Sequence, residues 1–277
     1  MRLSKVFSWS VRLVILTLIL IWSGFPILMV ILSAFKDPKH VFDYPPKFIF
    51  KPSLNNFIDL TKTWPEFYRT LLNTFIITIG AVVLTIILCF LAGYAYSRFR
   101  SRTLSMSAFF MLVVRMLPPI VMTIPLYPAF SKLGLFDKHI TLVLLYTVFF
   151  LSLGTFLMKS FIDQLPVELD ESAFMDGASR FQILTRIIFP LSAHGLMATG
   201  TFVMIFSWKE YMYALLFTTT KAKTSPLIIS EMLSSLTGVV WGPVFAAATL
   251  QLIPILVYLL LVQKVLADGL LAGSIKG

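Results

Sequence analysis

Cysteine, charged residues and nucleotide-binding glycine patterns are all scarce in this sequence. Cys89 is the single cysteine among 277 residues, so no intrachain disulfide can form and a disulfide-stabilised secreted fold is excluded. Asp, Glu, Lys and Arg make up only 13% of the chain, about half the share of an average soluble domain. No glycine is followed by lysine, which excludes a Walker A loop.

Candidate catalytic and metal-binding groups are also sparse. The three histidines, His40, His139 and His194, lie far apart, and with one cysteine they form no recognisable metal motif. No nucleophile and base stand at a spacing typical of a catalytic pair. We therefore expect no catalytic activity in this chain and no cofactor or metal bound by it.

Apolar residues are abundant instead, at 58% of the chain, and the mean hydropathy is +0.88. A soluble domain of this length leaves roughly a quarter of its potential surface exposed, so it cannot hide this much apolar area. The composition excludes a cytosolic enzyme and a disordered tail, and indicates a membrane protein. A net charge of +10 suits contact with membrane lipid at the anionic cytoplasmic face, so we expect no nucleic-acid partner.

The apolar residues gather in stretches long enough to cross a hydrocarbon core, which needs about 20 helical residues. Six such stretches are present: Val11–Ala34, about 71–97, about 104–130, Ile140–Ile162, about 195–217 and Val244–Val262. Lipid satisfies no free backbone group, so each stretch is expected to be a helix. The predicted fold class is therefore an all-α integral membrane protein with six transmembrane helices. Prolines at 118, 119, 125 and 128 are expected to break or kink the third.

The first stretch is predicted to be a retained anchor, because it is too long for a signal peptide and no small-residue cleavage site follows it. Basic residues orient the chain only weakly, since they divide almost evenly between the two sides. Two dense short segments lie on one side, Arg2 with Lys5 and Arg12, and Arg98 with Arg100 and Arg102. They favour an N-terminus inside, and an even number of spans then puts both termini in the cytoplasm.

The inner connection at 163–193 has the pattern of two short helices. Pro166 suits a first helical turn, and acidic residues follow it where the helix dipole favours them. Gly177 suits a left-handed helix end, and Ser179 with Gln182 has capping-box spacing. Phe181 begins an apolar stripe on the second helix, and Pro190 is expected to close the unit. A helix pair lying on lipid fits the second helix, but anionic lipid repels the acidic first one. We therefore expect the acidic helix to dock on a basic-edged protein groove.

This loop resembles the EAA loop of binding-protein-dependent ABC importer permeases. The resemblance is carried by Glu171-Ser172-Ala173, Asp176-Gly177-Ala178 and Pro190. The family has alanine where Ser172 stands and leucine where Phe189 stands, and neither departure removes a charge or the turn glycine. Other motifs resemble carbohydrate-type permeases in the same order along nearly the whole chain: Phe25-Pro26, Ser33-Ala34-Phe35-Lys36, Pro45-Pro46, Met116-Leu117-Pro118-Pro119, Ile124-Pro125-Leu126-Tyr127 and Leu133-Gly134-Leu135. The sequence is most similar to the second permease subunit of maltose/oligosaccharide-type importers.

The resemblance implies the type I ABC importer permease fold. Residues 1–66 would hold the N-terminal tail, a first helix wrapped on the partner, and an outer loop. Residues 67–264 would form the shared core, and 265–277 a cytoplasmic tail. The implied partners are a second permease subunit, two ATPase subunits that bind ATP and Mg, and an extracytoplasmic sugar-binding protein. The implied location is the inner membrane of a prokaryote.

The resemblance also implies roles for particular residues. The coupling segment would sit in a cleft of the ATPase and comprises Glu168, Asp170, Glu171, Ser172, Ala173, Asp176, Gly177 and Ala178. Glu171 would be its acidic contact, and Gly177 would set the turn. The outer segment 218–243 would reach into the binding protein.

Charged and kinked positions inside the spans are candidates for the substrate pathway. They are Arg115, Pro118, Trp208, Lys209 and Glu210. A charge within a span is expensive and usually faces a cavity or a partner, and discontinuous helices border transporter sites. For Arg115 the alternative is snorkelling to an interface or a structural pair. For Lys209 and Glu210 the alternative is a structural ion pair at the end of the helix.

We therefore predict the permease subunit of an ATP-driven sugar importer, which forms half of the translocation pathway. One alternative is a permease of the same superfamily for glycerol phosphate, a polyamine or a peptide. Another is a secondary transporter that needs no ATPase, against which stand the acidic docking loop and the lack of a second inverted half.

Overall fold

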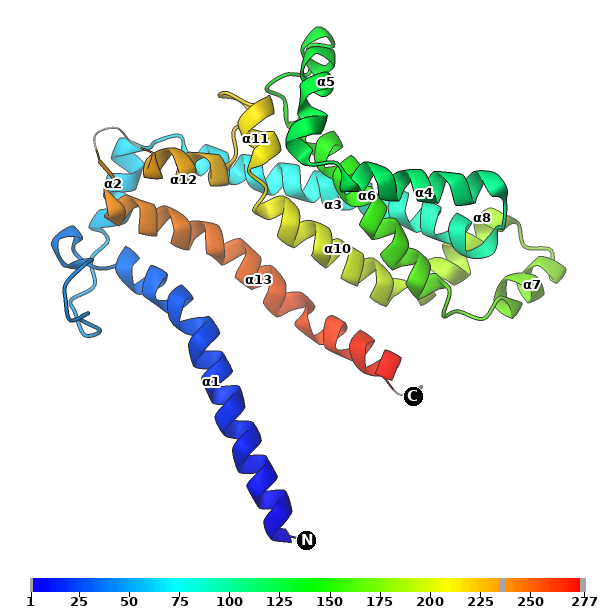
Figure 1. Cartoon of the computed structure of the whole chain (residues 1–277), viewed down its shortest axis with the longest axis horizontal. Coiled ribbons are helices and arrows are strands. Elements are labelled where there is room, and N and C mark those ends of the chain that lie inside the picture. The colour runs from blue at the N-terminus through cyan, green and yellow to red at the C-terminus, as the bar shows by residue number, and fades with distance from the viewer. Residues whose placement is uncertain (1, 235–237, 275–277) are drawn as a thin grey trace. The chain divides into compact units, whose positions relative to one another are not determined.

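The computed structural model describes residues 2–234 and 238–274, and every regular element in these ranges is a helix (Figure 1). The chain divides into two compact units. One consists of Met1–Tyr68 with Ile229–Pro254, and the other of Arg69–Ile228 with Ile255–Gly277. Residues 235–237 of the predicted outer segment and 275–277 of the predicted tail lie outside the described residues.

Four of the predicted stretches are single helices, each long and apolar enough to cross a membrane. They are α1 (Arg2–Ala34), α3 (Phe67–Arg98), α6 (His139–Ile162) and α13 (Trp241–Ser274). The last helix continues beyond the predicted span into the segment that we expected to be a tail. Two bent helix pairs bring the possible number of spans to six.

The third stretch is broken where its prolines predicted a break. α4 (Arg102–Met116) and α5 (Pro119–Lys132) meet at an angle of 101°. Leu117 has extended backbone angles, φ −75° and ψ 130°, because the ring of Pro118 disfavours a helical residue before it. α5 itself continues through Pro125 and Pro128.

The single helix expected at about 195–217 is wrong, because α10 (Ala193–Trp208) ends at Trp208 and α11 (Met212–Phe217) follows as a separate helix. The Glu210 carboxylate accepts the backbone N–H groups of Tyr213 at 2.9 Å and Ala214 at 3.3 Å. Those are first-turn donors of α11 that have no partner within the helix, so the acidic side chain favours a new helix start there.

The helical segment before α10 is bent from it by 74°. This segment comprises α8 (Arg180–Ile183), the π-helical turn η2 (Leu184–Ile188) and α9 (Phe189–Leu191). A wide π turn moves the preceding carbonyls away from the proline ring at 190, which an α-helix would crowd. The unit ends one residue after Pro190, close to the predicted position.

The shorter elements are η1 (Pro38–His40), α2 (Asn55–Thr63), α7 (Glu168–Met175) and α12 (Ser225–Leu233). In the first unit, the buried Asn56 of α2 caps the end of α1. Its Nδ2 donates to the carbonyls of Ala34 at 2.9 Å and Lys36 at 2.7 Å. A side chain at Gly242 would place its Cβ 2.2 Å from Asn56 Oδ1, so glycine is required beside this cap.

The core of the second unit is built on α3, α6 and α10, and it has two buried clusters. One contains Tyr146, Phe150 and Phe217, and the other contains Cys89, Met158 and Ile188. Gly154 of α6 and Gly200 of α10 allow close approach to α3, because a Cβ there would lie 2.6 Å from Cys89 Sγ and 2.8 Å from Ile86 Cδ1, respectively. Figure 1 shows α11 near one end of α6, and α7 and α8 beyond the other end.

Candidate functional site

The acidic helix α7 ends at the predicted glycine turn. Gly177 has φ +84°, and the N–H of Ala178 donates to the carbonyl of Ala173 at 3.0 Å. The predicted capping box is present in both directions. Gln182 N donates to Ser179 Oγ at 3.3 Å, and Ser179 N donates to Gln182 Oε1 at 2.7 Å. Local sequence therefore shapes this loop, and Pro166 lies two residues before the helix rather than inside it.

One acidic side chain of α7 attaches the loop to the end of α3. Asp170 pairs with Arg98 at 2.8 Å, and only 13% and 6% of these two side chains are exposed. Tyr94 donates its hydroxyl to the other oxygen of Asp170 at 3.0 Å. Arg98 also donates to the carbonyls of Ile162, the last residue of α6, and Leu165 in the connection that follows. It therefore joins α3, α6 and α7. This anchor holds α7 in a defined place against the helical body.

The other charged residues of the predicted coupling segment face outward. Glu168, Glu171 and Asp176 are exposed, as are Ser172 and Gly177, whereas Ala173 and Ala178 are half-buried against the core. Large apolar side chains lie beside these charges, with Phe174 58%, Met175 84% and Phe181 72% exposed. Acidic groups interleaved with exposed apolar ones are typical of a surface that another protein covers.

A cavity of about 440 Å³ lies between α7, α8 and the end of α3. Glu171 and Met175 line it on the α7 side, and Arg180 lines it from α8. The Arg180 guanidinium lies 5.0 Å from the ring of Phe99. The predicted coupling segment therefore has a cavity beside its acidic residues Asp170 and Glu171.

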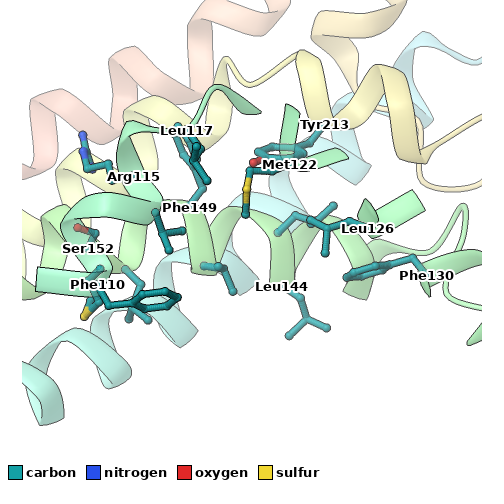
Figure 2. Close-up of a pocket in the computed structure, with 15 residues that line it drawn as sticks. Phe110, Arg115, Leu117, Met122, Leu126, Phe130, Leu144, Phe149, Ser152 and Tyr213 are labelled. Atoms are coloured by element: carbon teal, nitrogen blue, oxygen red, sulfur yellow. The ribbon is translucent and has the colours of Figure 1, made fainter. Parts of the chain in front are cut away.

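A second cavity, of about 310 Å³, lies between α4, α5 and α6 (Figure 2). Its lining is almost wholly apolar and includes Phe110, Met122, Leu126, Phe130, Phe149, Ser152 and Tyr213. Figure 2 shows Arg115 at one end, as the single charged residue among those that line it. The cavity lies beside the 101° bend between α4 and α5, since residues of both helices and Leu117 between them line it together with residues of α6.

The structure does not gather the five predicted pathway residues around this cavity. Arg115 lines it, and Pro118 stands at the bend without lining it. Trp208 is buried at the end of α10. Lys209 is exposed, with Nζ 4.4 Å from the ring centre of Phe206. Glu210 caps α11 and, among the described residues, forms no ion pair with Lys209.

Sequence reasoning missed the hydrogen-bond partners of two predicted residues, Asp170 and Glu210. Arg98 entered the prediction only as a topology charge, and Tyr94 did not enter it. Tyr213 lines the cavity between α4, α5 and α6, and its backbone N–H donates to the carboxylate of Glu210. The contacts of Tyr94 and Arg98 with Asp170 depend on the packing of α3 against α7, whereas the contact of Glu210 with Tyr213 joins residues three apart in the sequence. Within residues 2–234 and 238–274, no group of three or more His, Cys, Asp or Glu residues is arranged to hold a metal ion.

Residues 85–270 match the model of the family described as binding-protein-dependent transport system inner membrane component. The chain belongs to this family. It is therefore the membrane-embedded permease component of such a transport system, a multi-pass protein of the inner membrane, and not itself the catalytic component. The family as a whole works with a partner permease, an ATPase and a binding protein.

Named relatives extend the match over most of the chain. The trehalose/maltose transport system permease MalG of Thermococcus litoralis is 36% identical, covering 90% of this chain and 90% of its own. The trehalose transport system permease SugB of Mycobacterium tuberculosis is 34% identical, covering 76% and 78%. The fold matches a chain in the crystal structure of a bacterial ABC transporter involved in the import of the acidic polysaccharide alginate. The TM-score is 0.79 at 20% identity, covering 95% of this chain and 98% of that one.

Proposed function

We propose that this permease forms half of the translocation pathway of an ATP-driven sugar importer, and that a binding protein delivers the sugar. The observation that carries the proposal is the exposed acidic helix α7, which Asp170 fixes to the end of α3. The relatives named for trehalose and maltose transport support a sugar as the cargo.

The coupling segment docks on a separate ATPase subunit, and Glu171 is its acidic contact. Glu168, Glu171 and Asp176 face outward together with apolar side chains, which suits a groove with basic edges. Asp170 contributes differently, because its carboxylate is turned toward Arg98 and sets the position of the helix. Two ATPase subunits bind ATP and Mg, and their closure moves α7 as a lever. This chain needs no cofactor of its own.

In the membrane, the chain crosses six times, with both termini in the cytoplasm and each bent pair counted as one span. Residues 67–264 form the core shared with a second permease subunit, and 265–277 form the tail. The apolar side chains of α1 from Val11 to Leu28 are exposed. They meet lipid and the second permease, on which this helix wraps.

The outer segment 218–243 reaches into the binding protein, and the helix breaks next to Pro118 and Lys209 border the substrate pathway. Arg115, Trp208 and Glu210 are the other residues that border the substrate pathway. Broken helices frame binding sites in other transporters, because free backbone groups and helix ends line the cavity there.

The test is reconstitution. The purified complex of this chain, its second permease and its ATPases is placed in vesicles with the soluble binding protein that co-purifies with it. We expect ATP-dependent uptake of the sugar that this binding protein carries. A binding protein that carries glycerol phosphate, a polyamine or a peptide would refute the sugar class. Uptake by this chain without ATPase subunits, under an ion gradient alone, would refute the importer.

A further inference from the structure

Asp137 occupies an unusual position in the turn between α5 and α6. It is the only residue other than glycine with a positive φ in the part of the chain that the structure describes, at 56°, and it is 9% exposed. Its N–H donates to the carbonyl of Phe217, at the end of α11, at 3.0 Å. Aspartate tolerates the left-handed region better than most residues, but the conformation still needs support from its surroundings.

The Asp137 carboxylate binds the start of the outer segment. It accepts four consecutive backbone N–H groups, those of Thr219 at 3.1 Å, Thr220 at 3.2 Å, Lys221 at 2.9 Å and Ala222 at 3.1 Å. The hydroxyls of Thr219 and Thr220 donate to it as well, at 3.1 and 3.0 Å. Successive N–H groups around one anion form a concave nest, with the carboxylate here as the internal anion.

The carbonyl side of the same segment is held by α3. Asn73 Nδ2 donates to the carbonyls of Lys221 and Lys223, at 2.9 Å each. The Asn73 oxygen lies 2.8 Å from Nε2 of His139, in the first turn of α6. The segment is therefore fixed from both sides by elements that lie far from it in sequence.

The carboxylate forms no ion pair in the described residues, so backbone N–H groups and two threonine hydroxyls balance its charge. Burial alone would raise the pKa of Asp137, but the N–H groups of residues 219–222 lower this pKa by a larger amount. The pKa of Asp137 therefore lies well below its usual range. The group is ionised at neutral pH, and hydrogen bonds to an ionised acceptor are the strong kind.

We propose that Asp137 is a positioning residue, which holds the outer segment 218–224 in the one geometry that meets the binding protein. The inference rests on the proposed function, in which this segment contacts that protein. No sequence pattern assigns the residue a role. Its two attachments, to Phe217 and to residues 219–222, also join the end of α11 to the start of α6.

The test uses the intact transporter with all its subunits and compares Asp137→Asn with two matched variants. Asp137→Asn keeps the shape but turns an amide donor toward the N–H groups. The double variant Thr219→Val with Thr220→Val removes only the hydroxyl donors. Asp43→Asn is the control, since that half-buried aspartate bonds the side chains of Lys47 and His40 rather than backbone N–H groups.

The first measurement is hydrogen exchange of the amides at 219–222. We expect about 10-fold faster exchange in Asp137→Asn, a smaller change in the threonine variant, and none in Asp43→Asn. The second is ATPase stimulation by purified binding protein. The half-maximal concentration should rise about 10-fold in Asp137→Asn at an unchanged maximal rate, because docking is impaired and turnover is not.

Unchanged exchange in Asp137→Asn would overturn the proposal, since the nest would then not depend on the carboxylate. Faster exchange with an unchanged half-maximal concentration would overturn the positioning role. If binding protein fails to stimulate even the wild-type complex, the proposed function itself fails, and the wild-type measurement identifies that case separately.

Discussion

The Asp170–Arg98 pair offers the sharpest test of how α7 is held against the end of α3. We consider Asp170→Asn, which keeps the side-chain shape but leaves the Arg98 charge without its carboxylate. Removing one partner of a buried pair costs about 3–5 kcal/mol. Arg98 retains the carbonyls of Ile162 and Leu165 at 3.3 and 3.1 Å, so the lower end applies. A cost of about 3 kcal/mol shifts the equilibrium between docked and undocked α7 on the order of 100-fold.

The assay is hydrogen exchange of the α7 amides in the intact transporter, with exchange rates expected to rise by that factor. The matched control is Asp163→Asn. Asp163 pairs with Lys159, but these side chains are 42% and 34% exposed. Such a surface pair is worth about 0–1 kcal/mol, so exchange in α7 should change less than 10-fold. Equal effects of the two variants, or no effect of Asp170→Asn, would refute the anchoring argument.

Three further changes probe the loop, the pathway and the core. Glu171→Lys would place a cation against the proposed basic-edged groove, so stimulated ATPase activity and uptake should be lost while the subunits still co-purify. Normal uptake would contradict docking through Glu171. Lys209→Asn should change the substrate range or the uptake KM more than assembly, and an unchanged uptake profile would favour a structural role. Gly154→Leu should lower the free energy of unfolding by about 1–3 kcal/mol, the usual cost of overpacking, because its Cβ would lie 2.6 Å from Cys89 Sγ. The unfolding temperature should fall with it. Gly24→Leu, with no atom within 4 Å of its Cβ, should not lower it.

Several parts of the fold could be predicted because their causes are local. The break beside Pro118, the turn at Gly177 and the capping box at Ser179 each depend on residues within one helical turn. The separate helix α11 was missed. Apolar residues on both sides of Glu210 suggest one span, and this hydropathy outweighed the local signal that Glu210 lies three and four residues before the N–H groups it accepts.

The sequence by itself determined the class of protein. Its apolar stretches can be stable only as helices in lipid, and its acidic loop carries the motif by which the family resemblance is identified. Tertiary structure alone decided which acidic residues face outward and which are tied down. Asp170 meets Arg98 across 72 residues, and Asp137 meets the amide of Lys221 across 84. Composition and periodicity describe neighbours along the chain, whereas these contacts depend on how separate helices pack.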